Sequence, residues 1–183
     1  MEPLEIAEKI KNRFVSEVLG IKQFGDQVSV TVKRGRIIDI CSYVHDDPDI
    51  SMVFLSDLCG VDYPDRNPRF EVVYNLYSLK LRHRIRIKAL VPENDPYIDS
   101  VVSIWKGVNW HEREACDMYG IIFRGHPDLR RILMPEDWEG YPLRKDYPLE
   151  GPEGWEYKGF EQVKELHTHD DEWNITQKFD NRP

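Results

Sequence analysis

Several features are missing from this 183-residue sequence, and each absence excludes a class of protein. The three cysteines, Cys41, Cys59 and Cys116, are too few and too widely spaced for a disulfide framework, a Cys-x-x-Cys metal site or an iron–sulfur cluster held by this chain alone. We therefore expect reduced, mostly buried thiols. No glycine-rich phosphate loop and no nucleophile elbow occurs. The apolar runs are far shorter than the roughly 20 residues that cross a bilayer, so no transmembrane helix is expected.

Acidic residues outnumber basic ones, 33 to 25. The formal net charge of −8 disfavours binding to nucleic acid or to an anionic membrane surface, because both reward clustered Lys and Arg. The sequence starts MEPLEIAEKIKNRF, a charged amphipathic pattern that differs from a secretory signal, and this predicts that the chain stays in the cytoplasm. The length and the apolar content of 40% suit one domain with appendages.

The spacing of apolar residues predicts an α+β fold, with a mostly antiparallel or mixed sheet and helices on one face. The predicted strands are 27–32, 52–61, 70–79 and 83–91, and the last two form a hairpin. The predicted helices run from Pro3 to about Gly20, over 37–44 up to Pro48, over 99–105 and over 109–119. Asn109 is the expected cap of the last helix and Gly120 its end.

The last third of the chain changes in character. Residues 125–149 contain four prolines, which exclude a continuous helix or a central strand. They also carry more large apolar and aromatic side chains than a disordered linker does. After Leu149 the sequence is dense in charge, with widely spaced aromatics that suit an extended tail anchored on another surface. The expected division is a core domain at 1–123, a proline-rich docking arm at 124–150 and an extended tail at 151–183.

Metal-binding and catalytic interpretations find little support in the spacing of residues. Four possible metal ligands occur close together in the tail: His167, His169, Asp170 and Asp171. A metal site there finds no support, because no second group of ligands lies at the spacing of a structural metal site. His111 and Glu112 begin a zinc-hydrolase motif, but its second histidine is replaced by Ala115. Four acids in and around the connection between the predicted strands 52–61 and 70–79 suggest paired carboxylates or a calcium loop, yet calcium spacing is absent and a solvated loop explains them better; they are Asp57, Asp62, Asp65 and Glu71.

A cluster of charged residues at 112–117 precedes the proline-rich segment. Its members suit a solvent-facing helix surface, on which Arg113 and Asp117 are four residues apart; the others are Glu112 and Glu114. The segment that follows contains basic residues whose charges suit bonds to this cluster: Arg130, Arg131, Arg144 and Lys145. The cluster is therefore expected to hold the segment in place, and Arg144 and Asp146 are expected to be fixed by side-chain pairing.

The same region resembles a known family. A set of residues matches the signature of the 30 kDa subunit, or C-subunit, of NADH:quinone oxidoreductase, which is respiratory complex I: Glu112-Arg113-Glu114, Asp117-Met118-Tyr119-Gly120, His126, Arg130 and Ile132-Leu133. The continuation over 134–148, MPEDWEGYPLRKDYP, is similar to the same family, and weaker similarity extends the resemblance back to residue 50. The residues of the expected family signature or partner interface are Glu112, Arg113, Glu114, Asp117, His126, Arg130, Arg131, Trp138, Tyr141, Arg144, Lys145, Asp146 and Tyr147.

This resemblance implies a subunit of the peripheral arm of a proton-pumping NADH:quinone oxidoreductase, on the cytoplasmic side of the bacterial membrane. Such a subunit has no catalytic residue, metal or cofactor, and packs beside the quinone-site subunit, which is of the 49 kDa type, and the terminal-cluster subunit. The arm is then a docking element whose free amides a neighbouring protein satisfies. Two alternatives are the equivalent subunit of a membrane-bound nickel–iron hydrogenase or ferredoxin-dependent relative, and a stand-alone enzyme that uses the acids and His111.

Overall fold

The computed structural model describes residues 1–149, and Met1–Tyr147 form one compact unit. The helices of this unit are α1 (Pro3–Arg13), α2 (Ile37–Asp46), which follows a short 3-10 turn (Arg34–Arg36), and α3 (Val108–Tyr119). Its strands are β1 (Val18–Phe24), β2 (Gln27–Lys33), β3 (Phe54–Asp62), β4 (Phe70–Tyr77), β5 (Arg84–Val91), β6 (Tyr97–Asp99) and β7 (Ile122–Arg124).

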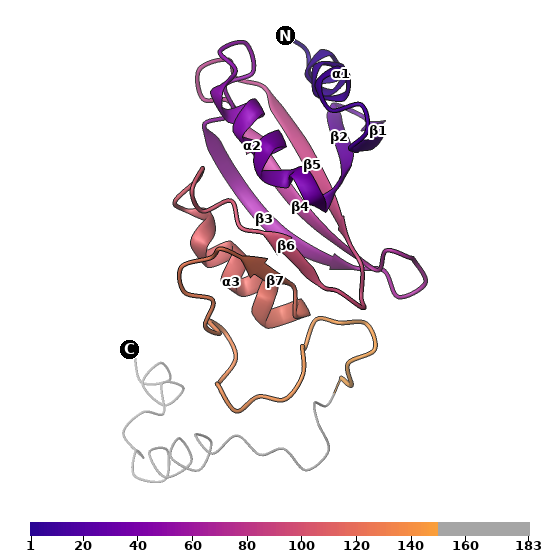
Figure 1. The fold of residues 1–183 in the computed structure, drawn as a ribbon, viewed down its shortest axis with the longest axis vertical. Coiled ribbons are helices and arrows are strands. Elements are labelled where there is room, and N and C mark those ends of the chain that lie inside the picture. Colours follow the sequence, from indigo (N-terminus) through magenta and orange to yellow (C-terminus); the bar gives the residue numbers. More distant parts are fainter. Residues whose placement is uncertain (150–183) are drawn as a thin grey trace, which may run out of the picture. The chain divides into compact units, whose positions relative to one another are not determined.

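Five of these strands form one mixed sheet in the order β1–β2–β5–β4–β3 (Figure 1). All neighbours are antiparallel except β2 and β5, which run parallel in the middle of the sheet. A parallel pair needs a long crossover, and the chain between β2 and β5 provides it with α2, β3 and β4. β6 and β7 form a separate parallel pair.

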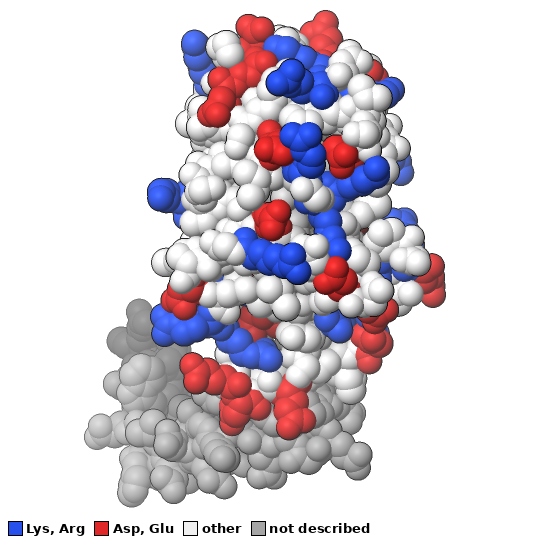
Figure 2. Space-filling view, in the orientation of Figure 1, with Lys and Arg blue, Asp and Glu red and all other residues white. Residues whose placement is uncertain are grey.

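The helices cover one face of the five-stranded sheet. Val30, Ile87 and Tyr74 lie in register on neighbouring strands and are fully buried, as are Ile6 of α1 and Ile40 of α2. Figure 1 shows α2 in front of the central strands, and Figure 2 shows acidic and basic side chains interspersed on the same side of the molecule. The opposite side of the sheet, which we call the open face, carries the strand residues that alternate with this core, and α3 reaches it at the edge strand, where His111 lies 3.7 Å from Asp57.

α3 packs against the edge strand β3 and joins the same core. Its residues Val108 and Ala115 belong to the main buried cluster. Gly60 of β3 permits the close approach, because a Cβ atom there would lie 2.6 Å from the ring of Tyr119. α3 ends at Gly120, whose φ of 74° is the left-handed conformation that favours glycine, as the sequence predicted.

The predicted strands, the hairpin and the helix before Pro48 are confirmed, with boundaries shifted by a few residues. The N-terminal helix ends at Arg13 rather than near Gly20, because residues 18–24 pair with β2 as an edge strand. The predicted helix at 99–105 is wrong. Val101 and Trp105 are buried at helical spacing, but they form only one turn, in which the Trp105 amide donates to the Val101 carbonyl.

Three smaller expectations also have outcomes. Asn109 lies inside α3 and does not cap it, because the helix starts after Gly107. All three cysteines are free thiols; Cys41 is buried and Cys116 half-buried, but Cys59 is exposed on β3. Within residues 1–149, no helix combines the length and the apolar character needed to cross a membrane.

Candidate functional site: the anchored arm

The candidate site is the arm, by which we mean residues 125–147, the described segment after β7. It contains no helix or strand and appears in orange in Figure 1. A segment without a hydrogen-bonded ladder keeps a defined path only if other groups bond to its backbone. In this chain the core itself supplies those groups, at two anchors.

The first anchor is Asp117 of α3, whose side chain is fully buried. Its Oδ2 accepts hydrogen bonds from the three consecutive amides of residues 132–134, at 2.9–3.1 Å. Its Oδ1 accepts from Nη1 of Arg131 at 2.7 Å. Burial raises the pKa of Asp117, but these bonds outweigh it and hold the pKa below its ordinary value. The predicted link between the charged cluster and the arm is confirmed at this carboxylate.

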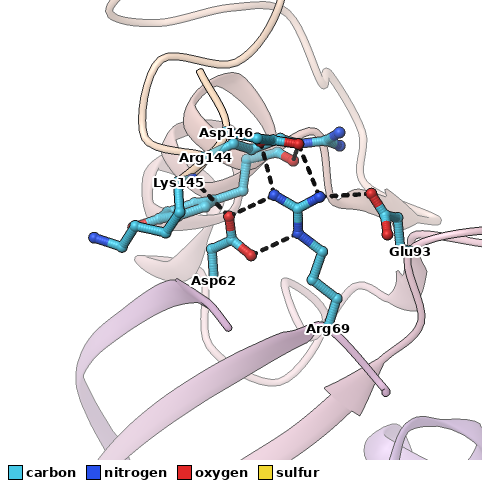
Figure 3. A network of polar contacts seen from close by, with 7 residues as sticks. Asp62, Arg69, Glu93, Arg144, Lys145 and Asp146 are labelled. Atoms are coloured by element: carbon cyan, nitrogen blue, oxygen red, sulfur yellow. Dashed lines mark hydrogen bonds and ion pairs between the residues drawn. The ribbon is translucent and has the colours of Figure 1, made fainter. Parts of the chain in front are cut away.

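The second anchor is Arg69, which precedes β4 (Figure 3). Its guanidinium donates twice to Asp62, at 2.7 and 2.8 Å, twice to Asp146 of the arm, at 2.7 and 3.0 Å, and once to Glu93, at 2.6 Å. All five N–H donors of the side chain are therefore used. The side chains of Arg69 and Asp62 are 7% and 0% exposed, so the ion pair between these two residues lies away from water. The hydrogen bonds that Arg69 donates lower the pKa of both Asp62 and Asp146.

Backbone and side chains next to Asp146 reinforce this second anchor. The amide of Lys145 donates to Oδ2 of Asp62 at 2.8 Å. Nε of Arg144 donates to the Tyr119 carbonyl at 2.7 Å, and its guanidinium lies over the ring of Tyr141, 4.5 Å from the centroid. A Cβ atom on Gly120 would lie 2.5 Å from that ring, so this glycine also lets Tyr141 close over the end of α3. The predicted side-chain pairing is confirmed for Asp146, whose partner is Arg69, whereas Arg144 is held by a backbone carbonyl, that of Tyr119.

The arm is also bonded between its two anchors. Arg131 donates from Nη2 to the Trp138 and Gly140 carbonyls, at 3.1 and 3.3 Å. The rings of Trp138 and Tyr147 stack with centroids 6.3 Å apart. The Tyr147 hydroxyl donates to the Glu139 carbonyl at 2.9 Å. Many of the arm's polar backbone groups are thus satisfied within the chain, and not by a neighbouring protein as the sequence suggested.

The start of the arm is fixed to α3 as well. Arg113 does not pair with Asp117; it donates from Nε and Nη2 to the carbonyls of residues 130 and 131, both at 3.0 Å. Nδ1 of His126 accepts from the Asp128 amide at 3.0 Å, which leaves Nε2 to donate to the Asn109 carbonyl at 3.1 Å. Arg130 does not reach the α3 acids and instead pairs with Asp128 at the surface.

Glu112 of α3 makes a different connection. It is fully buried and accepts hydrogen bonds from the Ser100 hydroxyl at 2.6 Å and from the Val101 amide at 2.8 Å, which ties the turn after β6 to α3. Burial raises the pKa of Glu112 to about 7, although the two hydrogen bonds oppose the shift. The expected solvent-facing surface is therefore wrong for Glu112 and Asp117, and correct for Glu114, which is exposed.

The acids near β3 are tied to separate partners. Asp62 and Glu71 are buried rather than part of a solvated loop, and Glu71 accepts from Lys88 at 3.1 Å. Asp57 accepts from Asn75 at 3.0 Å and lies 3.7 Å from Nδ1 of His111. Within residues 1–149, no group of three or more His, Cys, Asp or Glu is placed to hold a metal ion. The histidines and aspartates at 167–171 lie outside the described residues.

Sequence reasoning missed Arg69, Glu93 and Ser100 as partners of the signature residues. Arg69 and Asp146 are 77 positions apart, and no local pattern distinguishes Arg69 from the other basic residues. The sequence groups Asp62 with neighbouring acids and gives no sign of its bonds to Arg69.

Comparison with known proteins identifies the family. Residues 30–153 match the sequence profile of the family described as "Respiratory-chain NADH dehydrogenase, 30 Kd subunit". The chain belongs to this family. The match includes β3 to β7, α3 and the whole arm, so both anchors of this member of the 30 kDa subunit family lie inside the matched region.

Relatives and a solved structure agree with this family. The C-subunit of NADH-quinone oxidoreductase from Roseiflexus sp. (strain RS-1) is 51% identical over 144 residues, which cover 79% of this chain and 83% of the relative. The C-subunit from Geobacter sulfurreducens is 47% identical over 152 residues, covering 82% and 93%. A structure of the trypsin-resistant fragment of Nqo5 superposes with a TM-score of 0.60 at 32% identity, and the match covers 70% of this chain and all of the fragment.

Proposed function

We propose that this member of the 30 kDa subunit family is a non-catalytic, cofactor-free structural subunit of the peripheral arm of a proton-pumping NADH:quinone oxidoreductase, on the cytoplasmic side of the bacterial membrane. It docks on the quinone-site subunit, which is of the 49 kDa type, and on the terminal-cluster subunit. The names of its relatives, at about half identical residues, favour this complex over a membrane-bound nickel–iron hydrogenase or a ferredoxin-dependent relative.

The observation that carries this proposal is the combination of a fixed arm with exposed apolar side chains. The arm is bonded to the core at Asp117 and Arg69, yet Leu133 and Leu143 remain 60% and 48% exposed. An irregular segment that is already ordered binds a partner without the full entropy cost of ordering it. Exposed leucines on such a segment suit the apolar centre of a protein interface.

The charged residues support a structural role over a catalytic one. Asp62, Asp117 and Asp146 are held by guanidinium groups or backbone amides that fix the arm. The two guanidinium groups, those of Arg69 and Arg131, are themselves occupied by these carboxylates and by backbone carbonyls. Groups bonded in this way position chain segments and are poorly placed to exchange protons with a substrate.

The test replaces Leu133 and Leu143 together with serine. Both side chains are exposed, so the variant is expected to fold with an unchanged melting temperature. It should be recovered at least tenfold less often with the quinone-site and terminal-cluster subunits in complex purified from the host membrane. Complex that does contain the variant should retain its turnover, because no reacting group has been removed.

Val15→Ser is the matched control, since Val15 is 73% exposed in the connection between α1 and β1, away from the arm. It should assemble like wild type. Normal assembly of the double leucine variant would refute docking through the arm. Normal assembly combined with loss of turnover would instead indicate a catalytic role for the arm.

A further inference from the structure

The open face of the sheet carries a row of exposed and half-buried side chains that the arm and its anchors do not involve. At one end of the sheet, one residue from each of the five strands lies beside the next, in the order Phe24, Gln27, Arg84, Tyr77 and Phe54. Phe24 is in register with Gln27, Arg84 with Tyr77, and Tyr77 with Phe54. The parallel register of Ser29 with Arg86 places Gln27 beside Arg84. We call these five residues the end row.

The end row belongs to the open face because strand residues alternate between the two faces. Val28, Leu76 and Ile85, which neighbour the end row along their strands, are buried. Phe24 and Phe54 are 82% and 47% exposed. An open hollow of about 580 Å³ runs along the row between Gln27 and Phe54. Apolar side chains exposed beside such a hollow, like that of Phe54, are typical of an interaction surface.

Charge on the open face differs from that of the whole chain. The basic residues that point to this face outnumber the acidic ones, five to two; they are Lys22, Lys33, Arg84, Arg86 and Lys88, against Asp57 and Glu71. The complete chain has a net charge of −8, so its overall composition does not account for this excess. Neither Lys22 nor Arg84 forms an ion pair within residues 1–149.

We propose that the end row, together with the adjacent Lys22 and Arg86, is a second docking surface for an acidic segment of another subunit. The segment carries an apolar or aromatic side chain that enters the hollow between Phe54 and Tyr77, and carboxylates that pair with Arg84 and Lys22. Arginine and aromatic side chains side by side are the composition of interface anchors. The complementary charge on the partner aligns it along the row.

This inference rests on the proposed function, because it takes the partner to be a subunit of the same complex. The surface is distinct from the arm. The arm is bonded to α3, to the start of β4 and to the end of β3 at Asp62, whereas the end row lies where β3 begins and β4 ends. The two surfaces can therefore be tested separately.

The first experiment treats the purified complex with a carbodiimide, which joins a lysine amine to a carboxylate in direct contact with it. We expect a cross-linked peptide in which Lys22 is joined to an aspartate or glutamate of another subunit. Lys106 is the control, because it is exposed just before α3 and makes no ion pair within the described chain. A Lys22 joined only to a second copy of this chain, or not joined at all, would overturn the proposal.

The second experiment is a competition in the host between the wild-type chain and the variant Phe24→Ser/Arg84→Glu. Both positions are exposed, so the variant should melt like wild type. We expect it to be at least tenfold under-represented in the purified complex, while Lys106→Glu is incorporated as often as wild type. If Phe24→Ser/Arg84→Glu is incorporated as often as wild type while the variant with serine at Leu133 and Leu143 is excluded, the second surface is overturned and the proposed function stands. Equal incorporation of both refutes the two proposals together.

Discussion

Replacing Asp117 with alanine removes the acceptor of four hydrogen bonds at once. Three backbone amides, those of residues 132–134, and the guanidinium of Arg131 lose their partner. The carboxylate is fully buried and Arg131 is mostly buried, so little water is available to replace it while the arm stays in place. The expected response is that the arm opens locally while the sheet and its helices remain folded.

The size of the effect follows from these contacts. Removing one partner of a buried charged pair costs about 3 to 5 kcal/mol, because the other partner is left uncompensated. Opening of the arm limits this cost, since the freed amides then reach water. We expect a loss of about 3 kcal/mol in the free energy of arm opening, which corresponds to roughly a hundredfold change in the opening equilibrium. Asp117→Asn keeps one oxygen for the amides but turns an N–H group toward Arg131, so its effect should be intermediate.

Hydrogen exchange of the isolated chain measures this directly. The amides of residues 132–134 should be protected in the wild type and should exchange about a hundredfold faster in Asp117→Ala, while amides of β4 and β5 keep their rates. Asp137→Ala is the matched control, because Asp137 is an exposed acid of the same arm without an ion pair in the described chain. Equal exchange of residues 132–134 in wild type and Asp117→Ala would show that Asp117 does not hold the arm.

Three further predictions concern other parts of the chain. The pKa of Glu112 is raised to about 7, so its contribution to stability is present below about pH 4.5 and is lost as the pH rises to about 7. The free energy of unfolding measured with urea should therefore be close to wild type for Glu112→Gln at pH 5, but higher than wild type by up to about 3 kcal/mol at pH 8. The same pH dependence of this free energy in both proteins would contradict the prediction. Arg69→Lys keeps the charge but has three N–H donors instead of five, so hydrogen exchange of the Lys145 amide should become at least tenfold faster. An unchanged exchange rate would mean that the planar arrangement of the five guanidinium donors is unimportant. Removal of residues 151–183 should leave the melting temperature nearly unchanged and weaken binding to the quinone-site subunit at least tenfold, or about 1.4 kcal/mol; a truncated chain that unfolds would place the tail in the core.

Local signals in the sequence were sufficient for much of the fold. Alternation over β2, β4 and β5 identified half-buried strands, because successive side chains of a strand point to opposite faces. The signal failed at residues 18–24, where β1 is an edge strand with most side chains exposed, so that its few apolar residues continued the spacing of the preceding helix. It failed again at 99–105, where one buried turn has the same spacing as a helix.

The resemblance to the family was also determined by the sequence alone, since it rests on a nearly continuous run of residues from 112 to 148. The roles of those residues were not. Glu112 and Asp117 appear from spacing as members of a charged helix surface, but both are buried because the turn at 100–101 and the arm close over that side of α3.

Short-range signals in the sequence are therefore enough to identify the family, most of the strands and the irregular character of the arm, because prolines, alternation and a contiguous motif act over short distances. That the arm is held by its own chain follows only from the folded structure. Arg69 meets Asp146 across 77 positions, and Asp117 meets the amides of residues 132–134 on the side of α3 over which the arm closes. The parallel pairing of β2 with β5, which lines up the end row, has the same origin. Such contacts join groups that are distant in the chain, and the geometry of the folded core selects them.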